Sequence, residues 1–205
     1  RLWVAEQFSA GNGAYGMPLA LRLRGEVSLA LLIASLKCVV QRHEVLRTAY
    51  VADDDGDPLA VIAPEANVDF AVVDLSHLDR IEQEAQVAQA TLDNTRRPIN
   101  LAQAPLFRGQ ILRLGAHEHV LLYSMHHIIS DGWSMAVLVG ELVQHYAALK
   151  QGRGIDLPPL AVQYSDYAQW QLELEPAGVL QQQAGYWQDA LAGHPGHLLL
   201  PTDFA

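Results

Sequence analysis

The sequence has 205 residues, 50% of them hydrophobic, which is enough to bury the core of one large domain or of one lobe of a larger protein. Its formal net charge of -10 argues against nucleic acid and anionic membranes as partners, because both require a basic protein face. The single cysteine, Cys38, can form no internal disulfide, and neither a secretory signal nor an apolar run of transmembrane length is present, so we expect a soluble cytoplasmic protein.

The first half of the chain alternates between strand and helix patterns, without any internal repeat. Residues 17–23 alternate in polarity as a strand does, and after Gly25 a helix with Ser28 as its N-cap is expected to about His43. Two further strands are expected at 47–50 and 59–62.

The segment between these two strands is acidic, with the sequence DDDGD at residues 53–57. It lacks the spaced acidic ligands and the closing glutamate of an EF-hand loop. A solvated hairpin turn is therefore favoured over a calcium site.

The second half of the chain contains the clearest strand signal and most of the helix signals. The strands form a predicted hairpin over 106–114 and 119–125, turning at 115–118. Helices are predicted over 77–95 and around 164–174 and 179–191. Another helix is predicted to start near Asp131, with Ser130 or Asp131 as its N-cap. These elements predict an α/β fold in which helices flank a mixed β-sheet, and not a regular βαβ repeat.

The stretch MHHIISDGWS, residues 125–134, lies where the predicted hairpin ends and the next helix begins. Such a junction exposes side chains beside the positive end of a helix, where catalytic groups are often found. Neighbouring strand side chains point to opposite faces, so one of His126 and His127 would face a cleft while the other packs behind it. Asp131 could hold a guanidinium, and Gly132 could let a substrate come close. On the residues alone, structural and catalytic uses of the histidine pair are equally well supported.

A metal site is the first rival interpretation of this segment. Five candidate ligands crowd it, namely His117, His119, His126, His127 and Asp131. His117 belongs to the hairpin tip and His119 to the far end of a strand, several residues of 3.3 Å rise from His127, so we expect no metal site.

Nucleophilic catalysis is the second rival, and it lacks a motif. No serine or cysteine lies in a GxSxG elbow, and Ser130 and Ser134 resemble helix-start residues. No glycine-rich phosphate loop or dinucleotide fingerprint is present either.

Four motifs in order give the chain a family resemblance. They are RLW at 1–3, QRHEVLRT at 41–48, MHHIISDGWS at 125–134 with its HHxxxDG core, and YSDYAQW at 164–170, with PLFR at 105–108 between them. With these motifs the chain resembles the condensation domain of nonribosomal peptide synthetases over essentially its whole length.

The resemblance implies a chloramphenicol-acetyltransferase-like lobe. Residues 1–205 would be the N-terminal lobe of a two-lobed condensation domain, with the start of the first motif and the whole C-terminal lobe missing, and LLPTD at 199–203 would mark the passage to the second lobe. We expect the 205 residues alone to be inactive, because half of the active-site tunnel would be absent.

The implied activity is amide formation in the biosynthesis of peptide antibiotics and other secondary metabolites. A donor acyl or peptidyl thioester and an acceptor aminoacyl thioester, each on the phosphopantetheine of a peptidyl carrier domain, would be joined through the acceptor amine. The implied partners are the two carrier domains, the C-terminal lobe and an adjacent adenylation domain, and the chain itself would bind no cofactor.

The resemblance also assigns roles to residues. His127 would be the catalytic histidine, His126 its partly structural neighbour, and Gly132 the glycine whose backbone N–H could help a developing oxyanion. Asp131 would form a structural salt bridge with Arg42. The remaining assignments are Arg47 as second choice for that bridge, and structural roles for His43 and Glu44.

Other functions stay open beside condensation. An epimerization domain shares HHxxxDG, and an O-acyltransferase of the same superfamily makes esters, but QRHEVLRT and YSDYAQW favour condensation over both. The cyclization variant is disfavoured because it replaces the histidine pair with aspartate. A non-catalytic docking lobe is the alternative from a different class.

Overall fold

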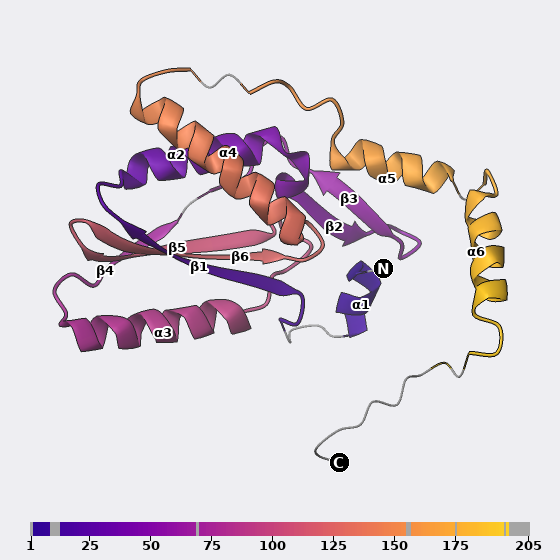
Figure 1. Ribbon diagram of the computed structural model, residues 1–205, viewed down its shortest axis with the longest axis horizontal. Helices are drawn as coiled ribbons and strands as arrows, with labels where there is room; N and C mark the ends of the chain where they lie inside the picture. The colour runs from indigo at the N-terminus through magenta and orange to yellow at the C-terminus, as the bar shows by residue number, and fades with distance from the viewer. Residues whose placement is uncertain are drawn as a thin grey trace, which may run out of the picture. The chain divides into compact units, whose positions relative to one another are not determined.

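The computed structural model describes residues 2–8, 13–68, 70–154, 157–174, 176–194 and 196 (Figure 1). It divides into two compact units, Arg1–Gln163 and Tyr164–Ala205. The histidine pair and the sheet that carries it belong to the first unit. The LLPTD segment predicted to end the lobe lies outside the described residues.

A four-stranded sheet forms the centre of the first unit, in the order β1-β6-β5-β4. β1 (Gly16–Arg24), β6 (Glu118–His126) and β5 (Phe107–Gly115) are mutually antiparallel, whereas β4 (Ala71–Asp74) runs parallel to β5. The predicted mixed sheet and the β5–β6 hairpin are therefore confirmed. β4 was not predicted, because four residues without alternating polarity give no strand signal.

Helices cover both faces of this sheet (Figure 1). α2 (Leu29–Arg42) and α4 (Gly132–Lys150) pack together over one face, and α3 (Arg80–Arg96) lies against the other. The alternation of β6 divides the core accordingly: Leu121 and Tyr123 face α2 and α4, whereas Leu122 belongs to the cluster beneath α3. α2 and α4 were predicted from their hydrophobic spacing and caps, and α3 was predicted as a polar, glutamine-rich helix.

A two-stranded sheet lies beside the end of α2. β2 (Thr48–Ala52) and β3 (Pro58–Ile62) form the predicted hairpin, and Asp53 Oδ1 closes its turn by accepting the N–H groups of Asp55 and Asp57. The short 3-10 helix η1 (Glu44–Arg47) and the helix α1 (Leu2–Phe8) were not predicted, because each is too short to show a periodic pattern.

The second unit consists, in its described residues, of α5 (Tyr164–Glu173) and α6 (Val179–Ala190), both predicted. Along α5 the ring of Tyr167 lies 5.9 Å from that of Tyr164 and 5.7 Å from that of Trp170. In the part of the chain that the structure describes, no helix is long and apolar enough to span a bilayer.

Candidate functional site at the histidine pair

The histidine pair lies at the end of β6, with its backbone held from two sides. The last strand residue, His126, donates its N–H to Leu106 O at 2.9 Å, and His127 donates to Tyr15 O at 2.8 Å. His126 is 2% exposed, whereas His127 is exposed to solvent. The two side chains therefore face differently, as the alternation of the strand predicted.

The His127 ring is oriented by one hydrogen bond. Its Nδ1 lies 2.8 Å from the carbonyl oxygen of Ser130, at the end of the turn that follows β6. A carbonyl oxygen can only accept, so Nδ1 carries the proton and the lone pair of the neutral ring lies on Nε2. This hydrogen bond therefore fixes which ring nitrogen of the neutral His127 side chain has the lone pair.

The His126 ring has the opposite arrangement. Its Nδ1 accepts the backbone N–H of Ile128 at 3.1 Å, so the proton of the neutral ring lies on Nε2, 3.6 Å from Glu6 Oε2. Burial lowers the pKa of His126, and the nearby Glu6 opposes that shift only in part. His126 is therefore a neutral, packed residue.

Asp131 begins α4 as its N-cap, one of the two caps predicted. Its Oδ1 accepts the hydroxyl of Ser134 at 2.6 Å and the backbone N–H of Ser134 at 2.7 Å. These two hydrogen bonds lower the pKa of Asp131 below its usual range. The carboxylate thus fixes the start of the helix that follows the histidine pair.

The predicted salt bridge between Asp131 and Arg42 is wrong. Arg42, in the last turn of α2, instead pairs with Glu141 further along α4, Nε to Oε1 at 3.1 Å. The second choice, Arg47, donates to Ala63 O and lies 3.6 Å from Glu44 Oε1. The Asp131 carboxylate points toward α4. It accepts hydrogen bonds from Ser134 in the first turn of that helix, and not from the guanidinium of Arg42.

His43 and Glu44, which were expected to have structural roles, make contacts that join separate parts of the fold. His43 Nε2 lies 2.7 Å from Glu141 Oε2, on the same carboxyl group that binds Arg42. The backbone N–H of Glu44 is bound by Gln163 Oε1 at 3.2 Å, and Gln163 Nε2 donates to Arg42 O at 3.0 Å. The QRHEVLRT stretch therefore ties α2 to α4 and to the end of the first unit.

Gly132 is the first residue of α4, and the space around it is open. A Cβ built on it would meet no heavy atom within 4 Å. Its backbone N–H belongs to the first helical turn, where N–H groups lack intrahelical acceptors. The position can therefore be approached closely from outside the chain.

The metal-ligand candidates extend from the turn before β6 to the start of α4. His119 pairs in register with Leu23 and Arg113 near the start of β6, and His126 ends the strand, on the order of 23 Å away at about 3.3 Å per residue. Among the described residues, no three His, Cys, Asp or Glu side chains are grouped to hold a metal ion.

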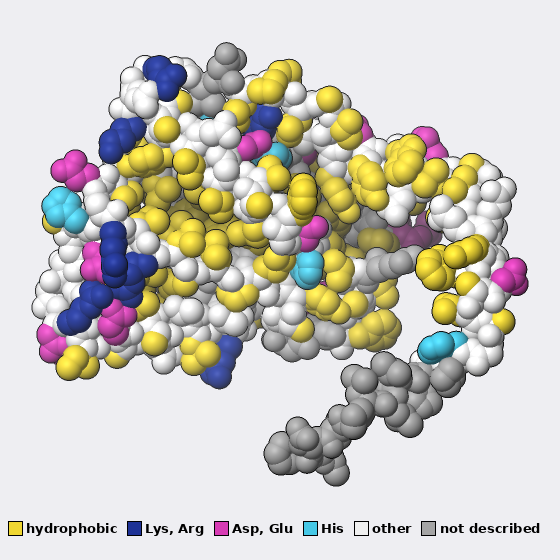
Figure 2. Space-filling view, in the orientation of Figure 1, with side chains coloured by type: hydrophobic (Ala, Val, Ile, Leu, Met, Phe, Trp, Pro, Cys, Tyr) yellow, Lys and Arg dark blue, Asp and Glu magenta, His cyan; other side chains and the backbone are white. Residues whose placement is uncertain are grey.

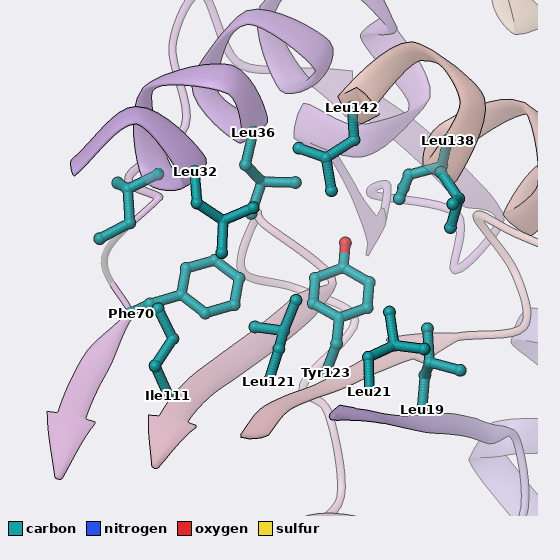
Figure 3. A pocket seen from close by; sticks show the side chains of 12 residues that line it. Leu19, Leu21, Leu32, Leu36, Phe70, Ile111, Leu121, Tyr123, Leu138 and Leu142 are labelled. Atoms are coloured by element: carbon teal, nitrogen blue, oxygen red, sulfur yellow. The ribbon is translucent and has the colours of Figure 1, made fainter. Parts of the chain in front are cut away.

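An apolar pocket lies between the sheet and the two helices α2 and α4 (Figure 3). Figure 2 shows hydrophobic side chains gathered in the hollow below these helices. Leu19, Leu121 and Leu138 are among its lining residues, and the hydroxyl of Tyr123 points into it. That hydroxyl is buried without a hydrogen-bond partner in the described part of the chain, and burial raises the pKa of Tyr123 far above its usual value.

Comparison with known proteins gives the family of the chain. A model of the family described as "Condensation domain" matches residues 1–205. The chain belongs to the condensation-domain family. One component of the linear gramicidin synthase of Brevibacillus parabrevis is 43% identical over 205 residues, 99% of this chain and 3% of that protein. Nonribosomal peptide synthetase kk1B of Curvularia clavata is 39% identical over 194 residues, 94% of this chain and 1% of that protein.

Solved structures share the fold of this condensation domain. The X-domain in its complex with OxyB from teicoplanin biosynthesis is 31% identical, with a TM-score of 0.81 over 99% of this chain and 44% of that one. The starter condensation domain of rhizomide synthetase is 22% identical, with a TM-score of 0.83 over 95% of this chain and 46% of that one. The chain thus spans about half the length of these solved chains, and the family predicted from the sequence motifs is confirmed.

Three contacts of the site were missed from the sequence. The carbonyl of Ser130, which orients His127, could not be predicted, because every residue has a carbonyl group. Glu6 and Glu141 left a signal that was not used: each is the one acidic residue of a largely apolar helix, α1 and α4 respectively. A lone acid in such a helix is buried only with a partner.

Proposed function

We propose that this condensation domain forms an amide bond between two carrier-bound substrates. The amine of an aminoacyl thioester attacks the carbonyl carbon of an acyl or peptidyl thioester, and the C–S bond breaks as the C–N bond forms. The acyl group passes to the nitrogen, the thiol leaves, and the amine loses one proton. The observation that carries the proposal is the exposed His127, whose lone pair on Nε2 is fixed by the Ser130 carbonyl.

His127 is proposed to act on the attacking amine. An α-amino group has a pKa of about 7.7 to 8.0, so a useful fraction is unprotonated near neutrality. Its N–H becomes acidic as the C–N bond forms, and an imidazole lone pair at hydrogen-bond distance accepts that proton or holds the amine on its line of attack. Both roles need Nε2 free, which the Ser130 hydrogen bond supports.

Gly132 is proposed to lie near the thioester carbonyl. Its N–H starts α4, and the absence of any heavy atom within 4 Å of a built Cβ leaves room for a substrate. A backbone N–H at a helix start stabilises a developing oxyanion, because donor and helix dipole are both oriented before the reaction.

The substrates are proposed to arrive on the phosphopantetheine arms of an upstream and a downstream carrier domain. An adenylation domain would load the downstream carrier, and a second lobe would complete the tunnel to His127. The relatives support a multidomain setting, because the chain matches only 1% to 8% of their lengths.

A docking role is the second candidate function. The X-domain that shares this fold was solved in a complex with OxyB, so the fold itself can present a binding surface to another protein. A docking role requires no oriented lone pair at His127, which makes the two candidates separable by experiment.

Product analysis tests the proposal. The intact protein is mixed with a preloaded donor carrier and a preloaded aminoacyl carrier, and the acceptor-bound product is examined by mass spectrometry and chiral analysis. We expect a dipeptidyl thioester with unchanged stereochemistry at the donor. Inverted stereochemistry without transfer would indicate epimerization, transfer only to an alcohol would indicate an O-acyltransferase, and no reaction would favour docking.

A further inference from the structure

Glu6 carries a buried carboxyl group that the proposed reaction does not use. The residue lies in α1 and is 8% exposed. Its Oε2 lies 3.6 Å from His126 Nε2, and neither atom has another hydrogen-bond partner among the described residues. Burial of a carboxyl group is costly unless a polar or charged partner compensates it, and His126 is the partner that faces Oε2.

The hydrogen bond at His126 Nδ1 determines that the ring proton lies on Nε2, the atom that faces Glu6. His126 Nδ1 accepts the N–H of Ile128, so Nε2 carries the proton that faces Glu6. The ring of Tyr15 lies 6.1 Å from the His126 ring on the way into β1. The titratable groups that act on His126 are Glu6 from α1 and His127 from its own turn.

The His126 ring in turn holds the turn that carries His127. Its Nδ1 binds the N–H of Ile128, its carbonyl accepts the N–H of Ile129 at 3.1 Å, and the turn ends at Ser130, whose carbonyl orients His127. If the His126 ring rotates, the Ile128 N–H loses its acceptor and the turn loosens. A 3.6 Å approach between Glu6 and His126 therefore connects α1 to the hydrogen bonds of the turn that ends at His127 Nδ1.

We propose that Glu6 is a positioning residue for the condensation reaction, acting through His126 on the turn that orients His127. The proposal rests on the proposed function, because it gives His127 the chemical role. Glu6 itself touches no reacting atom, so its loss should lower kcat and leave KM for both carriers nearly unchanged.

The neutral state of His126 is part of this arrangement. A protonated ring would carry hydrogen on Nδ1 and could no longer accept from Ile128. Burial lowers the pKa of His126 and favours the neutral ring, whereas the carboxyl group of Glu6 raises it. Removal of the acid should therefore lower the His126 pKa further.

Two substitutions at Glu6 test the proposal, with a matched control on the same helix. Glu6→Leu removes the acceptor without opening a cavity, and Glu6→Gln keeps an acceptor oxygen without charge. Gln7→Leu makes a similar change at the neighbouring exposed position. Transfer in the intact protein at varied carrier concentrations, amide exchange at Ile128 and NMR titration of His126 are measured for each.

We expect Glu6→Leu to lower the transfer rate about tenfold or more, to speed exchange at Ile128, and to leave KM within about twofold. Glu6→Gln should restore most of the rate and slow Ile128 exchange again, with a lower His126 pKa than wild type. Gln7→Leu should match wild type in all three measurements.

Normal transfer and normal Ile128 exchange in a folded Glu6→Leu variant would overturn the proposal. An equal rate loss in Gln7→Leu would do so too, since it would indicate a general effect of α1. The exchange and titration measurements need no activity, so they judge this proposal even if a His127 variant shows that the proposed function is wrong.

Discussion

Arg42 and Glu141 form a nearly buried ion pair that joins the end of α2 to the middle of α4, with Nε and Oε1 3.1 Å apart. Their side chains are 17% and 13% exposed, and His43 binds the second carboxyl oxygen at 2.7 Å. Because a buried charge without its partner is costly, the loss of either residue alone should cost about 3 to 5 kcal/mol of stability.

A double-mutant cycle tests this pair against the one expected from the sequence. Arg42→Met and Glu141→Leu should each destabilise the fold, and the double variant should recover much of the sum, because no unpaired charge remains. Arg42→Met combined with Asp131→Asn should be additive within about 0.5 kcal/mol. The free energies of unfolding are measured by chemical denaturation. Additive losses for Arg42 and Glu141, together with coupled losses for Arg42 and Asp131, would contradict the structure.

The sequence predicted the surroundings of the site better than its pairings. The β5–β6 hairpin, the Asp131 cap and the opposite burial of His126 and His127 depend on neighbours in the chain, which local patterns report. The partner of Arg42 depends on how two helices far apart in sequence pack together, as does the parallel pairing of β4 with β5. Local periodicity contains no information on such contacts.

Gly109 should not tolerate a side chain. A Cβ there would lie 1.5 Å from Cε1 and 2.1 Å from Cδ1 of Phe70, whose ring is buried in the core. Gly109→Ala must displace that ring and should cost about 1 to 3 kcal/mol or more. Gly140→Ala is the control, because open space surrounds it in α4 and alanine should add up to about 1 kcal/mol of stability. Equal melting temperatures for the two variants would contradict the packing.

Acid should weaken the ion-pair network at the start of α3. Arg22 and Arg80 bind the two carboxyl oxygens of Glu118 at 2.8 and 3.0 Å, where basic and acidic side chains lie together in Figure 2. The hydrogen bond from Arg22, then that from Arg80, lowers the pKa of Glu118 to about 2. The unfolded value is about 4.3, so the stabilisation is present above that pH and is lost as pH falls toward the folded pKa.

Thermal unfolding of Glu118→Gln measures this dependence. The variant should melt below wild type near about pH 7, and the difference should shrink as the pH approaches about 2. A difference that stays constant over this range would mean that Glu118 stabilises the fold by something other than its charge.

The hydroxyl of Tyr123 should be dispensable for stability. It points into the apolar pocket between the sheet and α2 and α4 without a partner among the described residues, so Tyr123→Phe should raise stability by about 1 kcal/mol. Tyr146→Phe makes the same change where the hydroxyl accepts the N–H of Ser28 at 2.9 Å, and should lower stability by about 1 kcal/mol. Destabilisation by Tyr123→Phe to the same extent would show that the hydroxyl has a partner in solution.

Transfer by a His127→Ala variant tests the central claim most directly. In the intact protein, single-turnover transfer between preloaded carriers is compared for wild type, His127→Ala and His126→Ala, with melting temperatures measured in parallel. Because His127 is exposed and supplies a fixed lone pair, its loss should lower the rate about 100-fold or more without lowering the melting temperature. His126→Ala should be milder in rate and worse in stability, because that ring is 2% exposed. Transfer by His127→Ala within about threefold of wild type would contradict the account.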